Sequence, residues 1–336
     1  MPDRRRMPAV LVTAATAVAL TLVPQPTASV AAPPTDCTYN HSGLVPLNDL
    51  GTGTYQGVTG GLYPNGANTR PAAHNTAGVN LAQNQVLPRN AAGQVDLVNG
   101  KIVLISIGMS NTTQEFQKFI QTVNAWGGKN PKLVLVDGAQ GGKDANAWAN
   151  PSDTTWSVLA TRLTGAGVTP AQVQAVWLKE QFVGDNLGAF PAGAQTLRNA
   201  LADIVRNARA KYSNLAVGYV ASRIYTYNPV RGAGAYQQGF AVKKLIEDQI
   251  NGDSTLAYGA GGVAPWLSWG PYLWADGLGS DRVAGGIPGR SDGLEWKCSD
   301  LVSDRVHPSD TGQQKVADLM LAQFSTDSTT TPWFNN

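Results

Sequence analysis

Short apolar runs alternate with amphipathic segments along this chain, from residue 101 to residue 324. Such runs are typical of strands buried on both faces of a parallel sheet, and apolar residues three and four positions apart mark helices. The expected strands span residues 101–107, 132–136, 173–178, 215–220 and 263–268. The expected helices lie near residues 112–123, 156–163, 197–212, 234–250 and 309–324. This alternation predicts right-handed β-α-β units, and therefore a parallel sheet covered by helices on both faces.

Ser110 lies in the turn between the first expected strand and its helix, where Thr112 and Glu115 have the spacing of a capping box. Ligands of an open parallel sheet bind outside the carboxyl ends of the strands. The Ser110 hydroxyl is therefore expected at the binding edge, with its backbone N–H near a helix N-terminus that favours an oxyanion. A serine in such a turn is also a common helix N-cap, so Ser110 alone does not define a catalytic site.

A second polar motif, Ser-Asp-Arg-Val-His-Pro at residues 303–308, immediately precedes the last expected helix. A serine hydroxyl becomes a good nucleophile when an imidazole removes its proton, and that imidazole needs an acceptor on its other nitrogen. Asp304 and His307 supply both groups from one tight turn. A local hydrogen bond that caps the helix is the alternative, and Ser110 at the same sheet edge favours the catalytic interpretation.

The order of these motifs resembles that of the SGNH/GDSL hydrolases. Residues 107–111 (Ile-Gly-Met-Ser-Asn) stand for the first block of that family, with Met where many members have Asp, and residues 304–308 match the last block. The resemblance covers roughly residues 100–325. It implies a three-layer α/β/α, flavodoxin-like sandwich with a five-stranded, mainly parallel sheet, and a triad of Ser110, His307 and Asp304.

The resemblance also implies an oxyanion hole. The family has a glycine for this purpose after the second strand, where this chain has Gly-Ala-Gln-Gly-Gly at residues 138–142. The expected donors are therefore the backbone N–H groups of Ser110, Gly141 and Gly142.

The third block departs from the family pattern, because Gly-x-Asn-Asp is absent after the third strand. Val-Trp-Leu-Lys-Glu-Gln stands there at residues 176–181 and is similar to the Trp-x-Gln-Gly-Glu region of the sialate and xylan acetylesterase branch. Gln181 or Lys179 is the candidate replacement for the missing donor. The alternative is that Trp177 packs in the core, that Glu180 forms a surface ion pair, and that backbone N–H groups alone make the hole.

An aromatic-rich stretch at residues 266–277 lies at the end of the fifth expected strand. Aromatic faces stack on sugar rings, so we expect Trp269, Tyr272 and Trp274 to bind a carbohydrate substrate, with a packed loop core as the alternative. His74 and Arg70 are further candidates to reach the pocket from the N-terminal region, and surface placement is their alternative.

The first 32 residues have the features of a signal peptide. A run of three arginines at residues 4–6 precedes an apolar stretch at 9–23, and small residues at 28–31 suit cleavage near Ala31 or Ala32. A membrane anchor is the alternative, but the apolar stretch is short for a span. The mature protein is therefore expected to be secreted, with no membrane span.

Two cysteines, Cys37 and Cys298, lie near opposite ends of the mature chain. In an oxidising compartment the simplest expectation is one disulfide bond between them, with two free thiols as the alternative. Such a bond would hold the N-terminal region beside the segment that carries Asp304 and His307.

The remaining composition excludes several classes of function. Lys plus Arg (25) and Asp plus Glu (23) nearly balance, and no basic cluster lies outside the leader, which argues against nucleic-acid binding. No group of residues has the spacing of a zinc site or a calcium loop, so neither a metal nor another cofactor is expected.

One domain is the simplest organisation after the leader. Residues 33–98 are rich in Gly, Asn, Pro and Thr and are expected to form an irregular N-terminal arm packed on the domain, which can include a short hairpin. Residues 99–326 form the hydrolase-like domain, and residues 327–336 a C-terminal tail.

Three functions fit this pattern. The first is a secreted serine esterase that removes acyl groups, above all acetyl, from a small-molecule or polysaccharide ester. The second is a lipase or phospholipid acyl hydrolase. The third is a non-catalytic glycan-binding protein on the same fold, which the altered third block favours.

Overall fold

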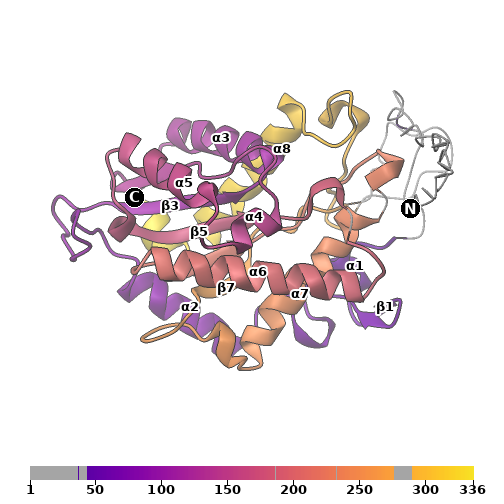
Figure 1. Ribbon diagram of the computed structural model, residues 1–336, viewed down its shortest axis with the longest axis horizontal. Coiled ribbons are helices and arrows are strands. Elements are labelled where there is room, and N and C mark those ends of the chain that lie inside the picture. Colours follow the sequence, from indigo (N-terminus) through magenta and orange to yellow (C-terminus); the bar gives the residue numbers. More distant parts are fainter. Residues whose placement is uncertain (1–36, 38–43, 186, 232, 276–289) are drawn as a thin grey trace, which may run out of the picture. The chain divides into compact units, whose positions relative to one another are not determined.

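In the computed structural model, which describes residue 37 and residues 44–185, 187–231, 233–275 and 290–336, five parallel strands form the central sheet (Figure 1). The strands are β3 (Ile102–Gly108), β4 (Leu133–Val136), β5 (Val173–Lys179), β6 (Val217–Val220) and β7 (Trp266–Trp269). Their order in the sheet is β4-β3-β5-β6-β7, which is the flavodoxin-like order. Every residue of β3, β5, β6 and β7 is buried, as expected for strands covered on both faces.

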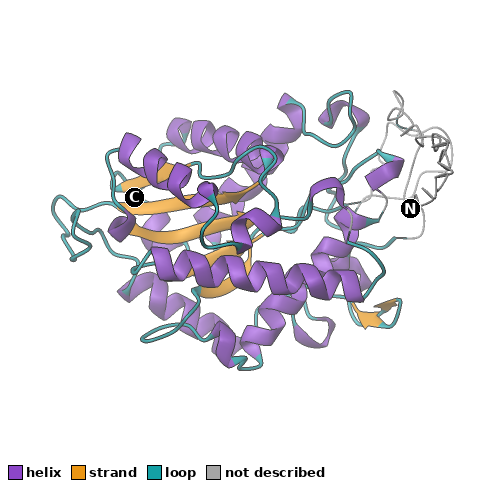
Figure 2. Ribbon diagram, in the orientation of Figure 1, coloured by secondary structure: helices purple, strands orange, loops and turns teal. Residues whose placement is uncertain are grey.

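Helices cover both faces of this sheet (Figure 2), with α2, α3, α8 and α9 in one layer and α4, α5, α6 and α7 in the other. The helices are α1 (Leu47–Leu50), α2 (Ala72–Asn84), α3 (Ser110–Ala125), α4 (Ala145–Ala149), α5 (Thr154–Gly165), α6 (Ala192–Lys211), α7 (Gly234–Ile250), α8 (Asp310–Thr326) and α9 (Thr331–Phe334). This arrangement confirms the expected three-layer α/β/α, flavodoxin-like sandwich.

The N-terminal region is more regular than its composition indicates. It holds the short antiparallel pair β1 (Thr54–Tyr55) and β2 (Val58–Thr59), in line with the expected hairpin, and also the helix α2, which the sequence did not predict. α2 packs closely on β7: a Cβ on Gly78 would lie 2.3 Å from the ring of Trp266. The His74 ring stacks on the same indole at 4.9 Å between centroids. The predicted signal peptide, residues 1–32, lies outside the described residues.

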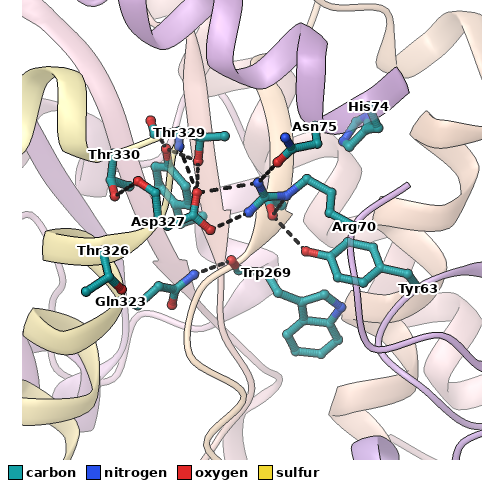
Figure 3. Close-up of polar contacts among 12 residues, drawn as sticks. Tyr63, Arg70, His74, Asn75, Trp269, Gln323, Thr326, Asp327, Thr329 and Thr330 are labelled. Atoms are coloured by element: carbon teal, nitrogen blue, oxygen red, sulfur yellow. Dashed lines mark hydrogen bonds and ion pairs between the residues drawn. The ribbon is translucent and has the colours of Figure 1, made fainter. Parts of the chain in front are cut away.

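The C-terminal residues are part of the domain and do not form a free tail. Trp333 and Phe334 of α9 are fully buried, and the ring of Phe334 stacks on that of Phe119 of α3 with 6.1 Å between the ring centroids. The segment before α9 binds the N-terminal region through Asp327, whose carboxylate accepts a hydrogen bond of 2.7 Å from Arg70 (Figure 3). These contacts explain why residues 327–336 are ordered together with the sheet.

Cys37 and Cys298 form a disulfide bond, which confirms the expected pairing. The bond joins residues 261 positions apart, and Cys298 begins the short 3-10 turn Cys298–Asp300, which precedes the segment that carries Asp304. Closing so long a loop restricts the unfolded chain strongly, which stabilises the folded state by about 2–5 kcal/mol.

Replacing both cysteines by serine is expected to lower the midpoint of thermal unfolding by roughly 5–15 °C, because the unfolded chain regains that freedom. Calorimetry of the oxidised protein, the reduced protein and the Cys37→Ser/Cys298→Ser variant measures the effect. Equal midpoints for all three samples would show that the cross-link contributes nothing to stability.

Candidate active site

Ser110 is the first residue of α3, and a single residue, Met109, separates it from the end of β3. The turn is tight because Gly108 has no side chain: a Cβ there would lie 2.3 Å from Thr112 Oγ1 and 2.4 Å from the carbonyl oxygen of Lys179. As a first-turn residue, Ser110 has a backbone N–H without an intrahelical acceptor. Ser110 therefore lies at the carboxyl edge of the sheet, as the sequence predicted.

The start of α3 differs from the predicted capping box. The helix begins at Ser110, and the Thr112 hydroxyl points into the core, where it donates a 2.7 Å hydrogen bond to the carbonyl oxygen of Lys179. The Glu115 side chain is also buried and forms an ion pair with the Lys179 ammonium. Both side chains thus attach α3 to β5 instead of capping the helix.

Three side chains from distant parts of the chain form one hydrogen-bonded row. The Ser110 Oγ lies 2.7 Å from the Nε2 of His307, although 197 positions separate the two residues. The Nδ1 of His307 lies 2.6 Å from the Oδ2 of Asp304. Hydroxyl, imidazole and carboxylate are thus linked in the order that activation of a serine requires.

The Asp304 carboxylate also holds the loop that carries Asp304 and His307 in its shape. Asp304 Oδ1 accepts hydrogen bonds of 2.9 Å from the backbone N–H groups of Val306 and His307, so both oxygens of Asp304 are used. Outside the loop, Thr226 donates a 2.7 Å hydrogen bond to the carbonyl oxygen of Arg305. The imidazole is therefore oriented by its own turn and by the segment after β6.

Electrostatics keep this carboxylate ionised. Partial burial alone would raise the pKa of Asp304, but the hydrogen bonds from the N–H and the ring of His307, and from the N–H of Val306, lower the pKa below its usual value. An ionised carboxylate beside Nδ1 would stabilise an imidazolium if His307 took the Ser110 proton.

The loop after β4 brings Gly141 beside Ser110. A Cβ on Gly141 would lie 3.9 Å from the Cβ of Ser110. Within the described residues, no acceptor takes the N–H of Gly141. Ser106 anchors the loop from β3, because its hydroxyl donates to Asp137 at 2.7 Å and accepts from the N–H of Gly138 at 3.0 Å. The N–H of Gly141 is thus a candidate donor to an oxyanion, together with that of Ser110.

Gly142 follows Gly141 with a positive φ of 73°, which favours glycine and turns the chain toward α4. A Cβ at Gly142 would meet no atom within 4 Å. The contacts of this residue therefore give no support to its predicted place in the oxyanion hole.

The last residue of β5, Lys179, and the two residues that follow it are buried. Trp177 is fully buried, as the packing alternative expected, but Glu180 is buried as well and forms no surface ion pair. The Lys179 ammonium is engaged by Glu115, which argues against Lys179 as the missing donor. Gln181 is also fully buried; its N–H donates to Glu180 Oε1 at 2.7 Å and its carbonyl oxygen accepts from Ala145 at 3.0 Å. The role of the Gln181 amide as a donor stays a prediction.

The predicted sugar-binding side chains lie in the core. Trp269, Tyr272, Trp274 and His74 are 3%, 5%, 0% and 5% exposed. Three of them have polar partners in the protein: the Trp269 indole donates to the carbonyl oxygen of Leu62 at 2.6 Å, His74 Nε2 lies 2.8 Å from that of Leu267, and the Tyr272 hydroxyl accepts from the N–H of Leu47 at 3.1 Å. So little exposed surface leaves no aromatic face for a sugar ring. The packed-core alternative describes Trp269, Tyr272 and Trp274, whereas buried His74 fits neither a substrate contact nor its alternative of surface placement.

Arg70 is also occupied, by Asn75 at 2.6 Å, by Asp327 at 2.7 Å and by Ser268 at 2.9 Å (Figure 3). These bonds attach the N-terminal region to β7 and to the C-terminal residues. They indicate a structural role for Arg70 in place of the predicted substrate contact.

Two further observations concern only the described residues. They contain no group of three or more His, Cys, Asp or Glu side chains arranged to bind a metal ion. None of their helices combines the length and the apolar character that crossing a bilayer requires.

Comparisons with known proteins add little to this geometry. No protein-family model and no curated protein matches the chain. A solved structure of an Arabidopsis thaliana protein matches with a TM-score of 0.34 at 14% identity, over 62% of this chain and 67% of the plant chain. A Bacteroides fragilis protein described as a "putative acylhydrolase" matches with a TM-score of 0.35 at 13% identity, over 76% of this chain and 97% of the bacterial chain. Scores and identities this low carry no argument about activity, so function is argued from the site.

Proposed function

We propose that this protein is a serine hydrolase that cleaves carboxylic esters, with Ser110 as nucleophile, His307 as general base and Asp304 as the residue that orients the base. The observation that carries the proposal is the unbroken row from Ser110 Oγ through both ring nitrogens of His307 to Asp304, with separations of 2.7 and 2.6 Å. All three side chains meet at the carboxyl edge of the parallel sheet, where such folds bind ligands.

The reaction that this geometry supports has two halves. Ser110 Oγ attacks the acyl carbon while His307 Nε2 takes the hydroxyl proton, and the tetrahedral intermediate collapses as His307 returns that proton to the departing alcohol. Water then attacks the acyl-serine with His307 again as base, and the carboxylic acid leaves as the Ser110 hydroxyl is restored.

The oxyanion of each tetrahedral intermediate needs hydrogen-bond donors. The backbone N–H groups of Ser110 and Gly141 are the proposed pair, because Gly141 lies against Ser110 and neither N–H has an acceptor among the described residues. Gln181 would be a third donor only if its buried amide turned toward this position. A hole with one donor fewer stabilises the transition state less, by a factor of about 10² in rate.

The narrower proposal is an exported acetylesterase that acts on a carbohydrate. Two observations support it: the disulfide bond suits an oxidising compartment, and residues 176–181 resemble the acetylesterase branch. The buried aromatic side chains do not support a sugar substrate. The carbohydrate part of the proposal therefore rests on residues 176–181 alone, whereas the acyl-ester part rests on the geometry of the site.

A fluorophosphonate probe tests the proposed function directly. We expect the mature protein to be labelled at Ser110, as found by peptide mass spectrometry, and a series of nitrophenyl esters to be hydrolysed fastest when the acyl chain is short. Preference for long chains would favour the lipase alternative. An unlabelled protein without esterase activity would contradict the proposal and favour the non-catalytic glycan-binding protein.

A further inference from the structure

Directly behind the nucleophile, the core contains an ion pair that the proposed reaction does not use. It joins Glu115 of α3 to Lys179, the last residue of β5, and the two side chains are 0% and 1% exposed. Glu115 lies in the second turn of the helix that begins at Ser110, and Lys179 pairs in register with Gly108 of β3. The pair therefore connects the helix of the nucleophile to the neighbouring strand.

This ion pair is an unfavourable way to stabilise a core. Burial raises the pKa of the Glu115 carboxyl and lowers the pKa of the Lys179 ammonium, so the surroundings disfavour both charges, and each is sustained mainly by its partner. Replacing a buried ion pair by neutral side chains of similar volume is often neutral or even stabilising. Stability alone thus gives no reason for two charges at this place, whereas buried ionisable groups beside a reactive residue commonly serve it.

A second contact from the same strand end acts on the same helix. The Thr112 hydroxyl donates to the carbonyl oxygen of Lys179 at 2.7 Å, so one residue of β5 holds α3 through both its backbone and its side chain. The segment that follows is fixed in turn: Gln238 of α7 donates to the carbonyl oxygen of Glu180 at 2.7 Å, and Ala145 of α4 donates to that of Gln181 at 3.0 Å. The end of β5 is thus a rigid support for the first turns of α3.

We propose that the Glu115–Lys179 ion pair positions Ser110, by fixing the first two turns of α3 so that the Ser110 hydroxyl and N–H keep their places relative to His307 and Gly141. This role rests on the proposed function. Glu115 and Lys179 act through the helix and touch no substrate, so they are positioning residues. A displacement of the nucleophile by about 1 Å would slow acylation by up to about 10²-fold.

The double variant Glu115→Gln/Lys179→Met tests this role, because it removes both charges without leaving one unpaired. We expect the kcat for nitrophenyl acetate and the rate constant of fluorophosphonate labelling to fall about 10- to 100-fold, while KM and the midpoint of thermal unfolding stay near the wild-type values. Lys179→Met alone leaves a buried carboxylate without its partner and is expected to lower the unfolding midpoint as well.

Arg198→Met is the matched control, since Arg198 binds Asp248 and Asp253 in a largely buried ion pair of α6 that has no contact with α3. It is expected to lower the unfolding midpoint and leave the labelling rate unchanged. A double variant that reacts as fast as the wild type would refute the positioning role alone. A wild-type protein that neither hydrolyses esters nor reacts with the probe would refute the proposed function, and the role of the ion pair with it.

Discussion

Ser110→Ala is expected to lower kcat for a short-chain nitrophenyl ester by about 10⁶-fold, because the substitution removes the atom that forms the acyl-enzyme. Ser110 Oγ lies 2.7 Å from the Nε2 of His307, and no other hydroxyl among the described residues is bonded to that nitrogen. KM should change little, because the hydroxyl contributes to bond formation more than to ground-state binding. Steady-state kinetics with the purified variant, and loss of probe labelling at residue 110, measure the effect.

His307→Gln should cost about as much, and the Ser110→Ala/His307→Gln double variant little more than either substitution alone, since the two groups act as one unit. Ser157→Ala is the matched control: among the described residues, the hydroxyl of this exposed serine of α5 bonds the carbonyl oxygen of Thr154 alone, so its loss should leave kcat unchanged. Residual activity of Ser110→Ala within tenfold of the wild type would rule out Ser110 as the nucleophile.

The parallel sheet was predictable because each strand is an apolar run, and the periodicity of its helices is visible in the sequence. The one clear error is at β7, expected over residues 263–268 and found at Trp266–Trp269. Pro265 has no N–H to donate, so the strand begins after it, and Val263 is 46% exposed. The start of a strand thus depends on backbone donors, which an apolar pattern does not show.

α2 could not be predicted from periodicity, because it has no broad apolar stripe. The side of α2 that faces β7 presents Gly78, Ala82 and His74, so the helix is stabilised by close approach to Trp266 and by ring stacking. Such contacts depend on the partner strand and leave no trace in the local sequence.

In the candidate site, the grouping of Ser110, Asp304 and His307 was easier to predict than the burial of the side chains around them. Asp304 and His307 were recognisable because they are only three positions apart in the sequence, which places both side chains on one loop. Glu115, by contrast, has the sequence spacing of a helix-capping residue. Its side chain points into the core because it pairs with Lys179 of β5, which the local sequence of the helix does not show. The aromatic residues at and after the end of β7 were misplaced for the same reason, since composition does not tell a stacking platform from a packed core.

Asp304→Asn is expected to lower kcat by about 10⁴-fold while leaving the loop intact. The amide oxygen of asparagine can still accept the two backbone hydrogen bonds that Asp304 Oδ1 accepts from Val306 and His307. The amide NH₂, however, would face His307 Nδ1 in place of the Oδ2 that lies 2.6 Å away, and it would favour the tautomer that cannot accept the Ser110 proton. Asp310→Asn, at an 83% exposed side chain on α8, is the control and should keep the wild-type kcat.

Asp304→Asn should also change how the stability of the fold depends on pH. Because the pKa of Asp304 is lower in the folded state than in an unfolded chain, the ionised carboxylate stabilises the fold above about pH 4, and this contribution is lost as the pH falls through the lowered pKa. Asp304→Asn has no such group, so its unfolding midpoint should lie below that of the wild type at neutral pH and converge with it in acid. Thermal unfolding from pH 7 to pH 3, followed for both proteins, measures the difference. A constant gap across that range, together with a kcat close to that of the wild type, would show that Asp304 neither orients His307 nor holds its loop as an ionised group.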